Sequence, residues 1–426
     1  MITYSILYSI EYRHKEEITM EITSVLEFIE QIENIVKKNT ASEKLYFRGE
    51  NNIFPLRIPS IYREKDGKAI FSRLYNESPR EYYFELFEEL GWPITDYGQK
   101  MFEKMVEAQH YGAVTNILDI TSNPLIALFF ACYGGKNKDG KVYIYKTNDM
   151  YIEHYFNRKV TIMTALNFIE RIKVDKFITL FKEIEKVSPT GKFLEIFVDS
   201  TFTTENIFES LSSIFNHDGT NIPEFFLMDF ESYQIPFTNI KVNDLGDIIS
   251  ENRCSEEAIQ EITSFLQKLL NKNEYESYKD VFKEMDINTL QLYLLGVMRT
   301  IMDDFLNQLN EHARTREQII YPLDVYKIIT QSYVVKASKI NERIKNQRGA
   351  FIVPSYIPTV GKTITQFQDE LDESIRNNIG FNRAFTIPST SKVKILRQLK
   401  IIGIDEGFIY PEVANIAKAT LDKYKD

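Results

Sequence analysis

A continuously apolar segment between clear start and stop signals constrains the fold of this chain more than any other feature. Residues 125–133 are apolar on nearly every face of a helix, which predicts a helix buried on most sides. Thr121, Ser122 and Asn123 are all good N-cap residues, and Pro124 suits the first helical position. The segment therefore predicts a sharply started helix that other elements cover.

A strand is expected soon after this helix. Gly134 and Gly135 end the helix, because glycine readily adopts the left-handed conformation found at helix C-termini. Asp139 and Gly140 are a predicted turn, and residues 142–145 have the composition of a strand. A short exposed loop is thus expected to join the buried helix to the strand.

Helical patterns lie on both sides of this segment. Ser24 and Glu27 form a capping-box pattern ahead of a helix that ends near Val36, and further helices are expected over 78–92 and 97–112. Towards the C-terminus the patterns predict strands at 334–335 and 351–353, a short helix or turn at 339–346, and helices over 389–403 and about 411–424.

These patterns divide the 426 residues into three blocks, which suits a chain long enough for two or three folding units. Residues 1–150 and 331–426 have mixed character. Residues 151–330 are mostly helical, with patterns near 259–269 and 288–310. We therefore expect an α+β protein that carries a mostly helical insertion.

Composition excludes several classes of protein. The chain is 43% hydrophobic and 26% charged, which is typical of a globular protein, and it has neither a membrane-spanning apolar run nor a secretion signal. Cys132 and Cys254 lie in different segments, which argues against a disulfide framework or a zinc site and favours the cytoplasm. The net charge of −10 disfavours binding to a phosphate backbone. If the target is a macromolecule, we therefore expect a protein and not a nucleic acid. Oligomerisation stays open.

Three short motifs resemble the FRG domain family, in the right order. Residues 46–50 read Tyr-Phe-Arg-Gly-Glu, which is similar to the signature that names the family. Residues 108–121 resemble its second and most specific motif. Residues 341–344, Gln347 and residues 349–351 resemble its third motif.

The resemblance spans about residues 20–150 and 331–415, so the block 151–330 is expected to interrupt one domain. The family is found largely in bacteria and phages and is associated with defence or toxin-like settings. The resemblance therefore implies that this protein is an effector of bacterial or phage conflict. It would act either as an enzyme or as a binding protein.

A weaker resemblance is to ADP-ribosyltransferases of the arginine-serine-glutamate type. Residues 47–49, 120–122, 127–130 and 140–143 are similar to the motifs of those enzymes in order and kind. This resemblance implies an ADP-ribosyltransferase-like core with a small mixed or antiparallel sheet and flanking helices. It also implies transfer of ADP-ribose from NAD, or cleavage of NAD, with NAD as substrate and no resident cofactor.

The resemblance assigns candidate roles to individual residues. The Arg48 guanidinium is suited to hold a dinucleotide phosphate through paired hydrogen bonds, although a structural pair with Glu50 is the alternative. Thr121 or Ser122 would position the nicotinamide ribose, with helix capping as the alternative. The other residues expected at the NAD site are Gly49, Tyr111 and Thr115, of which Tyr111 is a better candidate for packing than for reaction.

One departure from those enzymes bears on catalysis. They carry a glutamate just before a late strand, which stabilises an oxocarbenium-like transition state, whereas this chain has Gln347 and no acid there. Three alternatives stay open. Gln347 orients a ribose hydroxyl, Asp119 or Glu50 supplies the carboxylate, or the site binds a ligand without reacting.

His110 and Asp119 complete the candidate catalytic residues. His110 ends a predicted helix, where it has either a structural role or that of a general acid or base. Asp119 is expected to accept hydrogen bonds in a buried network from Arg48 or Thr115. If the protein is an enzyme, we expect a deep pocket lined by Arg48, by Gln347 and by either Thr121 or Ser122. If it is a sensor or interaction module that binds a nucleotide or a phage protein, we expect this pocket to be shallow or filled.

Overall fold

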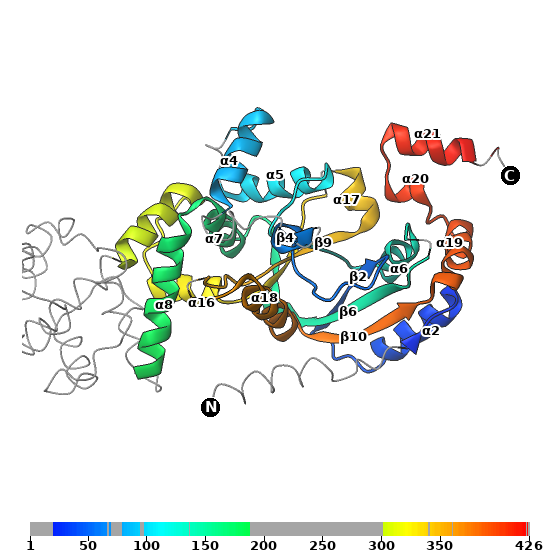
Figure 1. The fold of residues 1–426 in the computed structure, drawn as a ribbon, viewed down its shortest axis with the longest axis horizontal. Coiled ribbons are helices and arrows are strands. Elements are labelled where there is room, and N and C mark those ends of the chain that lie inside the picture. The colour runs from blue at the N-terminus through cyan, green and yellow to red at the C-terminus, as the bar shows by residue number, and fades with distance from the viewer. Residues whose placement is uncertain are drawn as a thin grey trace, which may run out of the picture.

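A single eight-stranded sheet runs through the centre of the protein, in the order β1-β10-β6-β2-β5-β9-β8-β7 (Figure 1). This computed structural model describes residues 20–65, 68–69, 79–93, 98–135, 137–187, 301–339, 341–359, 361–422 and 424. The strands are β1 (Met20–Glu21), β2 (Glu43–Glu50), β5 (Leu118–Thr121), β6 (Gly140–Asn148), β7 (Ile152–His154), β8 (Tyr333–Lys336), β9 (Gly349–Val353) and β10 (Phe381–Ile387). A separate pair consists of β3 (Glu64–Lys65) and β4 (Lys68–Ala69).

The sheet is mixed. The two outer pairs, β1–β10 and β7–β8, are parallel, and the described pairs between them are antiparallel. The α+β class and the mixed sheet are thus as predicted, but the sheet is larger than the small one expected. The sheet is larger because β1 and β10, near the two ends of the described chain, extend one edge, and β7, just after residue 150, extends the other.

The buried helix predicted from the apolar run is α6 (Pro124–Cys132). Its N-cap is Asn123, whose side-chain oxygen accepts a hydrogen bond from the Leu125 backbone N–H at 2.9 Å. Gly134 and Gly135 follow with φ of 78° and 53°, in the left-handed region that a helix C-terminus requires. The predicted helix start, burial and end are confirmed.

The predicted turn at Asp139 and Gly140 is wrong in one respect. Gly140 is the first residue of β6 and pairs with Ile387 of β10. A Cβ atom at Gly140 would lie 2.1 Å from the Ala131 carbonyl oxygen. The glycine is therefore needed because the strand starts against the backbone of α6, and not because the chain turns there.

Most other predicted helices are confirmed. The Ser24 hydroxyl caps α2 (Val25–Val36) by accepting from the Glu27 backbone N–H at 3.2 Å. The predicted helices over 78–92, 97–112, 389–403 and 411–424, and the predicted short helix or turn at 339–346, correspond to α4 (Arg80–Glu89), α5 (Gly98–His110), α19 (Lys392–Ile401), α21 (Val413–Asp422) and α17 (Glu342–Gln347). The helices α18 (Ile364–Ile379) and α20 (Glu406–Ile409) were not predicted. The predicted strands at 334–335 and 351–353 lie within β8 and β9.

Helices cover both faces of the sheet. On one face, α2, α6 and α19 pack on residues such as Phe47, Ile144 and Phe385. On the other face, α18 packs on Tyr145 and Ala384. Because successive strand residues point to opposite faces, neighbouring residues of β2 serve different cores.

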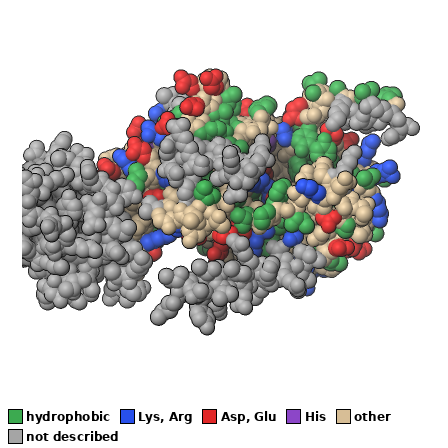
Figure 2. Space-filling model, in the orientation of Figure 1, with side chains coloured by type: hydrophobic (Ala, Val, Ile, Leu, Met, Phe, Trp, Pro, Cys, Tyr) green, Lys and Arg blue, Asp and Glu red, His purple; other side chains and the backbone are tan. Residues whose placement is uncertain are grey.

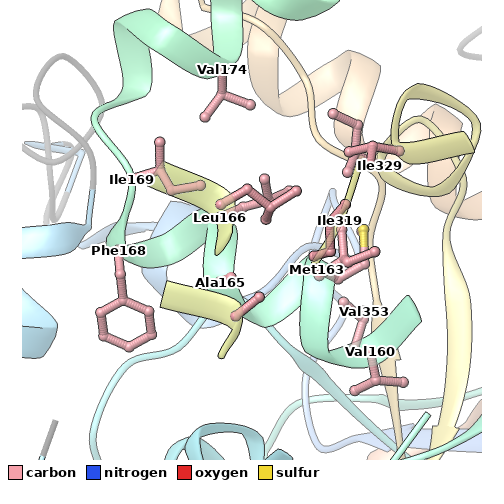
Figure 3. Packing of buried hydrophobic residues seen from close by; sticks show 14 of the residues in the cluster. Val160, Met163, Ala165, Leu166, Phe168, Ile169, Val174, Ile319, Ile329 and Val353 are labelled. Atoms are coloured by element: carbon pink, nitrogen blue, oxygen red, sulfur yellow. The ribbon is translucent and has the colours of Figure 1, made fainter. Parts of the chain in front are cut away.

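A third core joins the segments on either side of residue 150. Figure 3 shows part of it after residue 150, where Met163 and Leu166 lie near Ile329. The helices that contribute to it are α4, α5, α7 (Arg158–Ala165), α8 (Arg171–Val187), residues 301–313 and α16 (Pro322–Ile329). These helices pack with β8 and β9, and β7 pairs with β8. The boundary predicted at residue 150 thus falls inside one sheet, while the helical patterns at 259–269 and 288–300 lie outside the described residues.

Within the part of the chain that the structure describes, no helix has the length and apolar character needed to cross a membrane.

Candidate functional site

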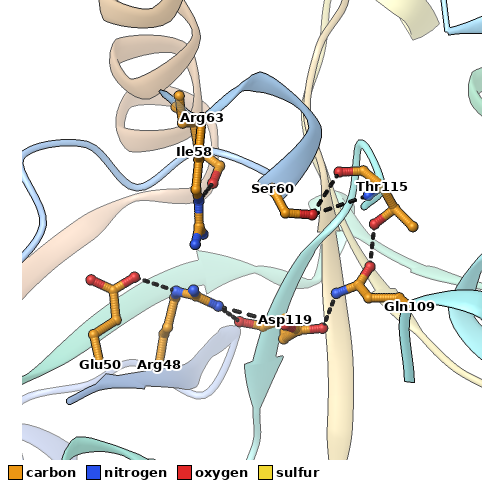
Figure 4. Close-up of polar contacts among 8 residues, drawn as sticks. All are labelled: Arg48, Glu50, Ile58, Ser60, Arg63, Gln109, Thr115 and Asp119. Atoms are coloured by element: carbon orange, nitrogen blue, oxygen red, sulfur yellow. Dashed lines mark hydrogen bonds and ion pairs between the residues drawn. The ribbon is translucent and has the colours of Figure 1, made fainter. Parts of the chain in front are cut away.

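The FRG-like motifs meet where strands β2 and β5 separate. β2 pairs with β6 along its whole length, but it pairs with β5 only at Phe47 and Thr121. Beyond that pair the two strands diverge, and the Arg48 side chain lies between them (Figure 4). Its Nη1 donates a hydrogen bond to the Asp119 main-chain oxygen at 2.8 Å, which satisfies a strand carbonyl that the neighbouring strand leaves free.

Arg48 is also paired through its other edge. Its Nε donates to Glu50 Oε1 at 2.8 Å, so the structural pair with Glu50 foreseen for Arg48 is present. Burial alone would lower the pKa of Arg48, but Glu50 and Asp119 more than offset this, and the net effect is a raised pKa. Arg48 is therefore a permanently charged guanidinium held rigidly in the sheet.

Asp119 differs from the prediction of a buried network. Its side chain is 60% exposed, and its carboxylate lies 3.8 Å from Arg48 Nη1. The Gln109 side-chain amide donates to Asp119 Oδ1 and, through its oxygen, accepts from the Thr115 hydroxyl (Figure 4). Thr115 is buried and is held by Ser60, which accepts from the Thr115 backbone N–H at 3.0 Å. Gln109 thus links the exposed Asp119 carboxylate to the buried Thr115 hydroxyl and fixes the orientation of that carboxylate.

His110 ends α5, as predicted, and faces several charged groups. Its Nε2 is buried without a hydrogen-bond partner among the described residues. Burial, followed by the nearby Arg343, lowers the pKa of His110, and Asp119 and Glu412 only partly oppose this. Arg343 in turn donates to the His110 main-chain oxygen at 3.0 Å. The imidazole is therefore neutral near pH 7.

The lowered pKa of His110 predicts a pH-dependent contribution to stability. The unfolded chain binds the proton more tightly than the folded chain, so stability is present at high pH and is lost as the pH falls below about 6.5. We expect the stability advantage of the wild type over His110→Gln to shrink between pH 7.5 and 5.5. Urea denaturation of both proteins at the two pH values measures this, and an unchanged or growing advantage would contradict it.

Thr121 and Gln347 are brought together, but their contacts are structural. The Thr121 hydroxyl donates to the Gln347 main-chain oxygen at 2.7 Å and accepts from the Asn123 backbone N–H at 3.0 Å. The Gln347 side-chain amide donates to the Ile409 main-chain oxygen at 3.1 Å. Ser122 is exposed, and its backbone N–H donates to the Arg348 oxygen at 3.2 Å.

Gly49 and Tyr111 have other surroundings than expected. Gly49 faces α6, where an added Cβ would lie 1.8 Å from the Ala127 oxygen, so this glycine permits close packing. The Tyr111 side chain is 75% exposed, so the packing role predicted for it is wrong. The reason is that Tyr111 follows the last residue of α5 and turns away from the core.

Arg63 and Tyr145 are two residues of this site that the sequence motifs do not indicate. Arg63 follows a short 3-10 helix (Ser60–Tyr62), and its guanidinium is directed towards Arg48 (Figure 4). Tyr145 lies in β6, opposite Tyr46 of β2. Neither belongs to a recognisable motif, so only an alignment of relatives would have identified them from sequence.

Residues 43–140 match the sequence model of the FRG domain. The matched range begins with β2 and reaches the first residue of β6, and it contains Arg48, Gln109 and Asp119. The chain therefore carries an FRG domain, and the site described above lies in it. No curated protein and no solved structure matches the chain.

Among the described residues, no cluster of three or more histidine, cysteine, aspartate or glutamate side chains is arranged to hold a metal ion.

Proposed function

We propose that the FRG domain of this protein binds NAD at the Arg48 site and breaks its nicotinamide–ribose bond. The single observation that carries this proposal is the combination of a fixed guanidinium, Arg48, with the accessible carboxylate of Asp119 at 3.8 Å. A guanidinium recognises phosphate through directed hydrogen bonds. A carboxylate stabilises the positive charge that develops on the ribose when the bond to nicotinamide breaks.

Asp119 is the better of the two carboxylates for this role. Its side chain is mostly exposed, and Gln109 holds it in place, whereas the Glu50 side chain is only 2% exposed. In the proposed step the C–N bond to nicotinamide breaks and nicotinamide leaves with the electron pair. Water or a side chain of a target protein attacks the ribose carbon and loses a proton, for which neutral His110 is the candidate general base.

The surface supports a protein target over a nucleic acid. Among the described residues on the face shown in Figure 2, lysine and arginine side chains are interspersed with aspartate and glutamate and form no broad basic patch. The net charge of −10 acts in the same direction, because it repels a phosphate backbone. The role as an effector in bacterial or phage conflict rests on the resemblance to the FRG family alone.

A binding module without catalysis is the second candidate. It is favoured by the contacts of Thr121 and Gln347, which occupy both the hydroxyl and the amide that a ribosyltransferase would direct at its substrate. In this case the Arg48 site would recognise a nucleotide or a phage protein and report its presence. The two candidates differ in whether NAD is consumed.

The test is incubation of the purified protein with NAD, alone and with bacterial lysate. Nicotinamide release and a mass increase of one ADP-ribose unit on proteins are followed by mass spectrometry. We expect Asp119→Asn to lower the rate by about 100-fold or more, as loss of a group that acts in the transition state does. Arg48→Ala is expected to abolish release.

Asp149→Asn serves as the control, since this exposed aspartate lies beyond the opposite end of β2. Its rate should equal that of the wild type. Release that persists in Asp119→Asn would exclude Asp119 as the carboxylate, and a wild type that releases no nicotinamide in either sample would favour the binding module.

A further inference from the structure

Arg63 is half-buried and differs from Arg48 and Arg57 because no carboxylate forms an ion pair with it among the described residues. Its Nε donates to the Ile58 main-chain oxygen at 2.8 Å, which fixes the side chain to its own loop. Among the described residues, no carboxylate oxygen lies within 4.0 Å of its guanidinium. By contrast, Arg48 lies 2.8 Å from Glu50, and Arg57 lies 3.0 Å from Asp372.

The two guanidinium groups of Arg63 and Arg48 approach each other. Figure 4 shows Arg63 reaching down from the loop towards Arg48 on the strand below. Burial, and after it the charge of Arg48, lowers the pKa of Arg63 to about 10, although Glu50 and Asp119 partly oppose this. Glu50 and Asp119 lie beside Arg48, so the positive charge that lacks its own ion pair is that of Arg63, and an anion bound there would be stabilised.

Two buried polar atoms beside this pair also lack partners. Glu50 Oε2 and the Tyr145 hydroxyl have no hydrogen-bond partner among the described residues, and both residues are less than 5% exposed. Tyr145 lies opposite Tyr46 of β2, so Tyr145, Arg48 and Glu50 face the same side of the sheet. All three side chains influence the pKa of Arg63, which approaches from the loop above. Buried polar atoms are nearly always hydrogen-bonded, so this acceptor and this hydroxyl are available to a polar ligand.

The chemistry of the free groups defines that ligand. Two guanidinium groups recognise phosphate oxygens and match a diphosphate better than a single phosphate. Glu50 Oε2 only accepts hydrogen bonds when ionised, so the ligand must also carry a donor such as a sugar hydroxyl. A bare inorganic phosphate offers no such group and would be repelled by this carboxylate.

We propose that Arg63 and Tyr145 form, with Arg48 and Glu50, a subsite for a diphosphate-linked sugar. Arg48 and Arg63 bind the diphosphate, Glu50 Oε2 accepts a hydrogen bond from a sugar hydroxyl, and the Tyr145 hydroxyl bonds to the ligand. The inference rests on the proposed function, and it assigns the ADP-ribose half of NAD to this subsite. Nicotinamide then extends towards the exposed Asp119.

The test is calorimetric titration of the whole protein with ADP-ribose, ADP, adenosine and inorganic phosphate. We expect Arg63→Ala to weaken binding of ADP-ribose about 10- to 100-fold, as loss of hydrogen bonds to a charged group does. Tyr145→Phe should weaken it about 2- to 10-fold. Because the Tyr145 hydroxyl has no partner among the described residues, this variant should keep the wild-type melting temperature.

Two controls separate binding from folding. Arg397→Ala removes an exposed arginine of α19 and should leave affinity unchanged. Arg63→Lys keeps the charge and should recover part of the affinity if Arg63→Ala is unstable. In the wild type, ADP-ribose should bind most tightly, ADP less tightly, and adenosine and inorganic phosphate at least 10-fold more weakly than ADP.

The possible failures are distinct. A wild type that binds neither ADP-ribose nor ADP would overturn the proposed function together with this subsite. A wild type that binds ADP-ribose while Arg63→Ala and Tyr145→Phe bind it equally well would overturn the subsite and leave the proposed function standing. Equal affinity for inorganic phosphate and ADP-ribose would overturn the assignment of a sugar.

Discussion

Gly49→Ala is expected to destabilise the folded protein by at least about 3 kcal/mol, near the upper end of overpacking substitutions. A Cβ atom at Gly49 would lie 1.8 Å from the Ala127 oxygen and 2.8 Å from the Ala131 nitrogen. All these contacts are with the backbone of α6, so no side chain is able to rotate away. The strand and the helix would have to separate, and that would open the core that α6 fills.

Gly349→Ala is the matched control for this prediction. It also places alanine in a strand of the same sheet, but its nearest contact would be 3.5 Å, an ordinary van der Waals distance. We expect its urea midpoint to stay within the range of a surface substitution, a change of about 0.5 kcal/mol. Equal midpoints for Gly49→Ala and Gly349→Ala would show that α6 moves freely relative to β2.

Asp372→Asn is expected to cost about 3–5 kcal/mol, the usual result of breaking one side of a buried ion pair. Asp372 accepts from the Arg57 backbone N–H at 2.8 Å, from Arg57 Nη2 at 3.0 Å and from Arg376 Nε at 2.8 Å. The Arg57 and Asp372 side chains are only 4% and 7% exposed. Removing the charge of Asp372 would leave a buried guanidinium without its main compensation.

The Asp372 carboxylate also connects two distant parts of the domain. It lies on α18 and holds the loop after β2, 315 residues away in sequence from Arg57. Glu373→Gln, at the next and exposed position of α18, changes a carboxylate in the same way without touching that loop. Urea midpoints should fall for Asp372→Asn and stay unchanged for Glu373→Gln, and a wild-type midpoint for Asp372→Asn would disprove the ion pair's role.

Much of the secondary structure was predictable because its signals are local. The start of α6 depends on Asn123 and Pro124, and its end on two glycines that directly follow it. The strand alternation of β2 similarly predicts that Arg48 and Glu50 share one face. Such signals act over a few residues, so a single sequence contains them in full.

The candidate site was predictable only in part. The motifs indicated Arg48 and Asp119, and the structure brings these two residues into contact although they are 71 positions apart. They did not indicate Arg63, whose nearness to Arg48 depends on the course of a loop and not on its own neighbours in sequence. They also assigned Thr121 and Gln347 to a ligand, whereas each is occupied by a hydrogen bond to the main chain.

The sequence by itself determined where α6 starts and ends and which family the domain resembles, because capping, periodicity and motifs depend on consecutive residues. Only the tertiary structure decided what the motif residues do. The separation of β2 from β5 exposes the Asp119 carbonyl to Arg48, and the order of strands in the sheet places Tyr145 beside them. These positions follow from long-range pairing, for which no single stretch of sequence carries the information.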